Sequence, residues 1–170
     1  LSQVPDTANQ DFIFYNSQKI CAGNIQYSKM YIYGLSSQTW KSVDIPQHIG
    51  THSAGTYNNT ESAGFIYMRK NQESHISIFD LKNEEWQPKD DLIEKDVNVY
   101  DIINIDGKTC FITQKNPTHN GYWRFYDKEL RILNESNYIW EKTIALPFDH
   151  YEQIFEYENE LYFLNSSERL

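Results

Sequence analysis

The sequence predicts an all-β protein, and three observations lead to this fold class. Short runs rich in Ile, Tyr and Phe recur through the 170 residues, and Asn, Asp, Gly and Ser bound them, which is typical of strands and turns. A helical spacing of apolar residues is hard to find, and the one weakly helical stretch, residues 89–96, has too few apolar positions to dock firmly. The third observation is an internal repeat marked by tryptophans.

Strands are expected along the whole chain. The clearest apolar or alternating runs, in order, are residues 11–15, 29–33, 64–68, 75–79 and 109–113. A second element, two short strands joined by a tight polar turn, recurs at residues 15–21, 57–63, 105–110 and 157–162. Asp106-Gly107, in the third of these, is among the strongest local signals for a hairpin.

The repeat becomes visible when the chain is aligned on three tryptophans. Residues 30–40, 76–86 and 130–140 align without a gap, and each segment holds an apolar strand, a small polar turn and a Trp that opens the next strand. The Trp residues are 46 and 54 positions apart. With the upstream hairpin, the repeating unit has four strands. Four short strands at this period are typical of a β-propeller blade.

The repeat divides residues 1–170 into about three and a half blades. The expected blades are approximately residues 11–46, 51–93 and 97–147, with a partial blade at 150–165. A propeller ring needs at least about four blades, and blade faces are apolar because each packs on its neighbours. We therefore expect that further blades, from the same chain or another, complete the propeller.

The second repeat resembles the kelch family. Residues 51–55 resemble the kelch approach to the first strand, and Ile78-Phe79-Asp80-Leu81 followed by Trp86 resembles the third strand and its tryptophan. The resemblance extends over residues 11–165, although the paired glycines of the second kelch strand are approached only at Ala22-Gly23. The F-box-associated propellers also fit. The resemblance implies a non-catalytic protein-interaction module, a scaffold or an adaptor that recruits substrates to an assembly such as a ubiquitin ligase.

Composition limits the kinds of partner and the cellular compartment that we expect. The net charge of -9 argues against nucleic acid, and no apolar run is long enough to span a membrane. Cys21 and Cys110 fall at equivalent positions with a whole blade between them, so we expect no disulfide. Two buried free thiols favour a reducing, cytoplasmic compartment.

No motif predicts a catalyst, a metal site or a cofactor. The histidines form no short-spaced pair with Cys or with one another; they are His48, His52, His75, His119 and His150. Nucleophile motifs and phosphate-binding glycine loops are absent from the sequence. We therefore predict that the protein is not an enzyme. The alternative is a carbohydrate-binding or sugar-active propeller, a lectin or an oxidase or mutarotase, because propeller openings host sugar sites and the chain has 13 Tyr.

Two groups of residues stand out. The first, Trp40, Trp86 and Trp140, is expected to pack within the blades because it recurs at one frame position. The second lies in the expected loops between second and third strands, where we place the partner-binding residues: Tyr27, Arg69, Lys70, Lys115, His119, Tyr122, Trp123 and Arg124. A basic patch of Arg69, Lys70 and Lys115 would suit an acidic peptide. Residues 115–129 form either an extended hairpin or a separate loop.

Overall fold

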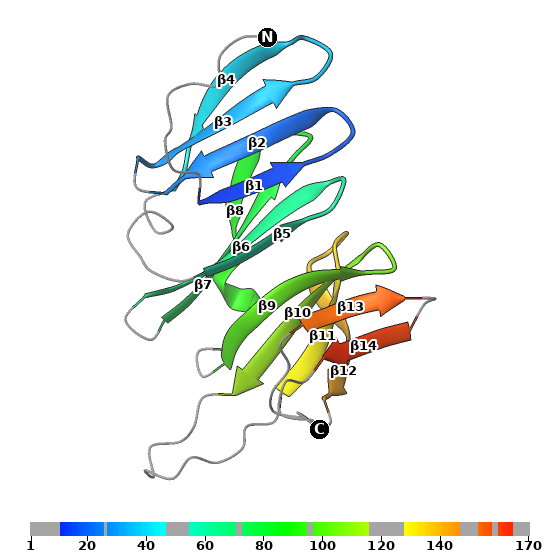
Figure 1. The fold of residues 1–170 in the computed structure, drawn as a ribbon. Coiled ribbons are helices and arrows are strands. Elements are labelled where there is room, and N and C mark those ends of the chain that lie inside the picture. Colours follow the sequence, from blue (N-terminus) through cyan, green and yellow to red (C-terminus); the bar gives the residue numbers. More distant parts are fainter. Residues whose placement is uncertain are drawn as a thin grey trace. The chain divides into compact units, whose positions relative to one another are not determined.

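The chain is built from strands. The computed structural model describes residues 11–25, 27–46, 55–70, 73–94, 97–115, 128–146, 153–157 and 160–164. These residues form 14 strands and one 3-10 turn, without an α-helix (Figure 1). They make three four-stranded antiparallel sheets of the propeller-blade type and one two-stranded sheet. The predicted fold class is therefore confirmed.

Each sheet follows chain order. Sheet 1 contains β1 (Phe12–Tyr15), β2 (Lys19–Asn24), β3 (Lys29–Gly34) and β4 (Thr39–Asp44), and sheet 2 contains β5 (Gly55–Asn59), β6 (Ala63–Lys70), β7 (Glu73–Asp80) and β8 (Glu85–Pro88). Sheet 3 contains β9 (Val97–Ile105), β10 (Lys108–Lys115), β11 (Lys128–Asn134) and β12 (Ile139–Ala145). The hairpin contains β13 (Gln153–Tyr157) and β14 (Glu160–Leu164). Residues 1–95 and 96–170 form two compact units.

The turn between the third and fourth strands has the same geometry in all three sheets. Its last residue has a positive φ, which is 55° at Gln38, 61° at Glu84 and 55° at Tyr138. The amide of that residue donates to the carbonyl four positions earlier, at 2.8, 2.7 and 2.8 Å respectively. The tryptophan follows two residues later in every case. A turn of constant length is the reason that the three sequence segments align without a gap.

The stretch predicted to be weakly helical forms a single 3-10 turn, η1 (Asp90–Leu92). The prediction that it would not dock firmly is wrong, because Leu92 and Ile93 are only 8% and 5% exposed. The Asp90 carboxylate accepts a hydrogen bond from the amide of Ile76 at 3.1 Å and lies 3.2 Å from Nδ1 of His75. These polar contacts tie the turn to β7 and compensate for the small number of apolar side chains.

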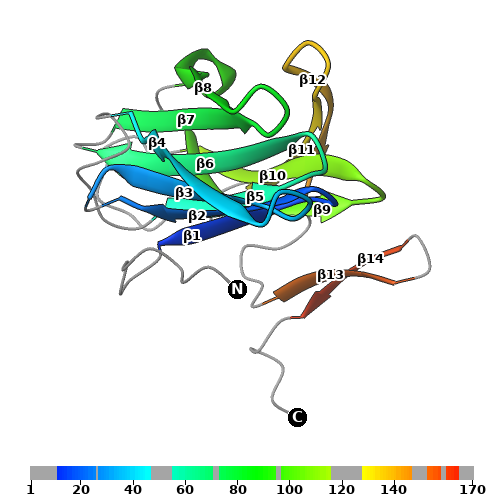
Figure 2. The same ribbon diagram turned by 90° about the horizontal axis from the view of Figure 1, so that it is seen from above.

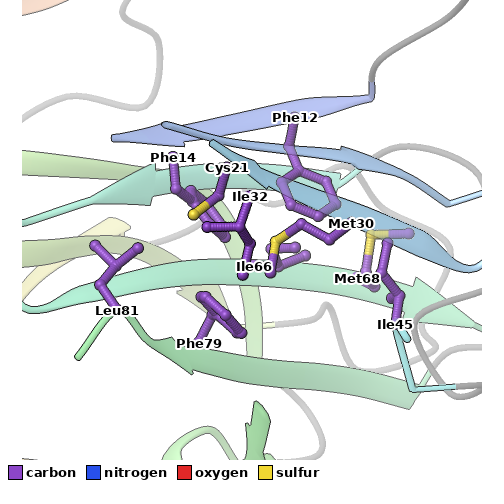
Figure 3. Close-up of a cluster of buried hydrophobic side chains, with 10 residues drawn as sticks. All are labelled: Phe12, Phe14, Cys21, Met30, Ile32, Ile45, Ile66, Met68, Phe79 and Leu81. Atoms are coloured by element: carbon purple, nitrogen blue, oxygen red, sulfur yellow. The ribbon is translucent and has the colours of Figure 1, made fainter. Parts of the chain in front are cut away.

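Sheets 1 and 2 pack face to face within the first unit (Figures 1 and 2). We call the face of sheet 1 that carries Cys21 its cysteine face, and the face of sheet 2 that carries Trp86 its tryptophan face. The two faces form one apolar cluster (Figure 3), which contains Phe12, Phe14, Cys21, Met30, Ile32, Ile45, Ile66, Met68, Phe79 and Leu81. Trp86 packs against it, with ring centroids 4.9 Å from Phe79 and 6.2 Å from Phe12. Burial of these side chains supplies most of the stabilisation between the sheets.

Glycine makes this close packing possible at one position. A Cβ built on Gly64 of β6 would lie 2.3 Å from the ring of Phe14, which comes from β1 of the neighbouring sheet. Phe14 is fully buried. The absence of a side chain at Gly64 therefore creates the space that the Phe14 ring occupies.

Sheet 3 repeats the cysteine face of sheet 1. Cys110 is opposite Ile132, just as Cys21 is opposite Ile32. Cys110, Ile112 and Leu130 form a buried cluster with partly buried aliphatic side chains around it. Both cysteines are buried and neither forms a disulfide within the described residues, and burial raises the pKa of Cys21 to about 11 despite nearby lysines. Thus the two cysteines serve as small apolar core residues at one frame position.

Candidate interaction surfaces

The frame tryptophans are half-buried and each contacts another aromatic ring. Trp40 lies 4.9 Å from Tyr33 and Trp86 lies 4.9 Å from Phe79, in both cases the residue directly opposite on the preceding strand. Trp140 makes an edge contact with Phe111 at 5.3 Å. The second residue of each fourth strand is therefore an indole that packs across its own sheet.

The turn between β2 and β3 presents Tyr27. Its side chain is 63% exposed, and its amide donates to Oδ1 of the buried Asn24 at 2.9 Å. A fixed backbone carrying an exposed aromatic ring is a suitable contact residue, because Tyr offers a large rigid surface.

The basic residues lie in strands and not in loops, which corrects their expected placement. Arg69 and Lys70 end β6, and Lys70 is directly opposite Glu73, so only residues 71–72 connect β6 and β7. Lys115 ends β10, in the second unit. The run of polar residues suggested a loop, but cross-strand pairing extends the hairpin. The remaining sequence candidates, His119, Tyr122, Trp123 and Arg124, lie outside the described residues.

The described residues show no group of three His, Cys, Asp or Glu side chains that could hold a metal ion. Of the histidines, His75 contacts Asp90, and His48, His52, His119 and His150 lie outside the described residues. In the same part of the chain, no helix is long and apolar enough to cross a membrane.

The other face of sheet 1 is an exposed apolar surface, as expected for a blade without a neighbour, although its residues were not among the sequence candidates. By analogy with sheet 2, we call it the tryptophan face of sheet 1. It consists of two cross-strand rows, Ile13–Ala22–Tyr31 and Tyr15–Ile20–Tyr33–Trp40. Ile13, Tyr15 and Ile20 are 43%, 65% and 38% exposed. Three exposed apolar side chains next to half-buried aromatic rings form the kind of continuous patch that marks an interaction site.

This face is equivalent to a face that is covered elsewhere in the chain. The frame aligns Tyr33 and Trp40 of sheet 1 with Phe79 and Trp86 of sheet 2, which pack on the cysteine face of sheet 1. A sequence signal was available, because residues 12–15 and 30–33 are apolar at both alternating positions. Strands with this pattern are buried on both faces.

No protein-family model matches the chain, and no curated protein matches it either.

Proposed function

We propose that this chain is part of a kelch-like β-propeller that acts as a non-catalytic protein-interaction module, as a scaffold or substrate-recruiting adaptor in the cytoplasm. The exposed tryptophan face of sheet 1 is the main support for this proposal. The equivalent face of sheet 2 is covered by the cysteine face of the neighbouring sheet. The occupant of the exposed face is accordingly a further four-stranded blade that presents an aliphatic cysteine-type face.

The repeat of the cysteine face supports this choice of occupant. Sheets 1 and 3 carry the same apolar positions on that face, with Cys21, Met30 and Ile32 matched by Cys110, Leu130 and Ile132. A blade of the same repeat would therefore bring an aliphatic surface of matching strand spacing. Such a pairing removes Ile13, Tyr15 and Ile20 from water, and the apolar area buried stabilises the assembly.

Light scattering coupled to gel filtration, together with binding of an apolar fluorescent dye, tests the exposed face. The chain should self-associate or bind the dye, and the double variant Tyr15→Ser/Ile20→Asn should do so less. Tyr27→Ser is the matched control, because Tyr27 is 63% exposed but lies outside this face. A monomer that binds no dye would reject the proposal. Loss of dye binding in a longer form of the chain would identify the blade's source as the same polypeptide, and loss only with a second chain would identify a partner.

The recruited partner is proposed to carry an acidic peptide. Arg69 and Lys70 are the last two residues of β6 and carry positive charges in a chain of net charge -9, with the acidic Glu73 directly opposite Lys70. Opposite charges at an interface raise the association rate and orient the partner. Reversing both charges, Arg69→Glu/Lys70→Glu, should abolish capture of a fluorescent polyglutamate peptide, whereas Lys82→Glu in the exposed β7–β8 turn should not. Equal capture by both variants would reject the peptide site.

The buried thiols support the proposed compartment. Cys21 and Cys110 are both buried, and neither forms a disulfide within the described residues. Free buried cysteines suit a reducing environment, where they persist as thiols. This supports the cytoplasmic part of the proposal.

A further inference from the structure

A cavity of about 510 Å³ lies in the first unit, at the edge of sheet 1 where its β1–β2 and β3–β4 turns meet the β7–β8 turn of sheet 2. Antiparallel order places Arg69 and Lys70 at the opposite end of the strands, so this cavity is separate from the proposed peptide site. Its polar lining includes Lys19, Lys41, Glu84, Gln18, Ser36 and Thr39.

Two lysines converge on one carboxylate in this cavity. Lys19 pairs with Oε1 of Glu84, and Lys41 pairs with Oε2 of the same side chain. Lys19 also donates to the carbonyl of Leu81 at 2.7 Å. The side chains of Lys19 and Glu84 are 15% and 17% exposed, whereas that of Lys41 is 57% exposed. The cluster therefore has a formal charge of +1 in a partly enclosed site.

The second lysine has no counterpart in sheet 3. Lys19 stands two residues before Cys21, and Lys41 directly follows Trp40. At the matching positions of sheet 3, Lys108 and Glu141 form a neutral ion pair at 2.9 Å. Sheet 1 thus has a cation where sheet 3 has an anion, although one lysine would be enough to bind Glu84.

The lining retains hydrogen-bond donors. An ammonium group has three donors, and the contacts among the described residues use two from Lys19 and one from Lys41. The hydroxyl of Ser36 and the carboxamide of Gln18 face the same cavity without a side-chain hydrogen bond within the described part of the chain. Excess positive charge together with several donors is the chemistry that recognises an oxyanion.

We propose that this cavity binds a phosphate or carboxylate group of a ligand. Lys41 and the third donor of Lys19 hold the oxyanion, Ser36 and Gln18 add neutral hydrogen bonds, and Glu84 competes with the ligand for both lysines. Because Glu84 is a built-in competitor, its removal should increase affinity, which a cluster serving only to join the two sheets would not do.

Titration of the ¹⁵N-labelled chain with inorganic phosphate, at constant ionic strength, tests the site. We expect saturable shifts in the amide signals of residues 18, 36, 37 and 39. Lys41→Gln should weaken binding by about tenfold, since a charge-assisted contact to a partly exposed lysine is lost and the Lys19–Glu84 pair remains. Glu84→Gln should tighten binding by about tenfold. Glutamine fits this turn, because Gln38 holds the equivalent position with a φ of 55°.

Lys82→Gln is the matched control, because it removes the same charge from an exposed residue of the same β7–β8 turn that does not line the cavity. Equal weakening by Lys82→Gln and Lys41→Gln would show diffuse charge attraction and overturn the site. Absence of saturable shifts in both the unaltered chain and Glu84→Gln would also overturn it. The ligand's source is decided by a phosphoserine peptide: binding at least about tenfold tighter than inorganic phosphate assigns the group to a polypeptide, and equal binding assigns it to a small molecule.

Discussion

Replacement of Gly64 by alanine should weaken the packing of sheets 1 and 2 of the first unit more than a substitution at an exposed position does. The new Cβ would lie 2.3 Å from a carbon of the Phe14 ring, far inside van der Waals contact. Phe14 is fully buried and its ring centroid lies 6.5 Å from that of Trp86, so a shift of the ring would disturb the packed cluster around it. Overpacking of this kind costs about 1–3 kcal/mol, and the better strand propensity of alanine returns about 0.5–1 kcal/mol. The midpoints of these ranges give an expected net loss in free energy of unfolding of about 1 kcal/mol.

Urea unfolding followed by tryptophan fluorescence measures this loss, because Trp86 reports on the affected interface. Gly34→Ala is the matched control: its Cβ would lie 2.5 Å from Oγ of Ser37, an exposed side chain that can rotate away. The double variant Gly64→Ala/Phe14→Leu should lose less stability than the sum of the two single variants, since the smaller side chain removes the clash. Equal midpoints for Gly64→Ala and Gly34→Ala, or strict additivity in the double variant, would refute the close-packing explanation.

Three further predictions concern local chemistry. Burial raises the pKa of Asp80, but hydrogen bonds from Asn83 and Lys82 outweigh burial and hold that pKa below its ordinary value. Asp80 therefore contributes stability at neutral pH that is lost as the pH falls through its folded pKa, and the gap in thermal midpoint between the unaltered chain and Asp80→Ala should shrink in acid; a gap independent of pH would contradict this. Because burial raises the pKa of Cys21 to about 11, its thiol should resist iodoacetamide at pH 8 in the folded chain and react in urea, as mass spectrometry of the labelled peptide would show; rapid native labelling would argue against a buried thiol. Gly107 has a φ of +70° and open space where a Cβ would lie, so Gly107→Ala should cost about 1 kcal/mol through backbone strain alone, and an unchanged thermal unfolding midpoint would exclude that strain.

The sequence determined the strands, the turns and the repeat, because these depend on short-range chemistry. The polar residues before Trp40, Trp86 and Trp140 create the same turn with one left-handed residue, and the constant spacing of apolar strand, turn and indole follows from it. Such local features can be predicted from the sequence without knowing which surfaces of the sheets pack together. For this reason the four-stranded blade could be predicted from the alignment alone.

Strand register changed the expected positions of candidate residues. The polar run that contains Arg69 and Lys70 predicted a loop, yet the pairing of Lys70 with Glu73 places both residues in a strand. Residues 89–96 have few apolar positions, which predicted weak docking, but the Asp90 carboxylate accepts a hydrogen bond from the amide of Ile76 and Leu92 is buried. A single sequence does not contain these cross-strand pairings, because they depend on residues that meet only when the hairpin closes.

The contacts between residues distant in the chain depend on how the two sheets stack. Lys19 and Glu84 are 65 positions apart, and they meet only because the cysteine face of sheet 1 packs on the tryptophan face of sheet 2. The same packing buries one apolar face of sheet 1 and leaves the other, with Tyr15 and Ile20, exposed. Apolar residues at consecutive positions predict that a strand has two apolar sides. Which side is covered depends on how the sheets pack, since the hydrophobic effect has no direction of its own.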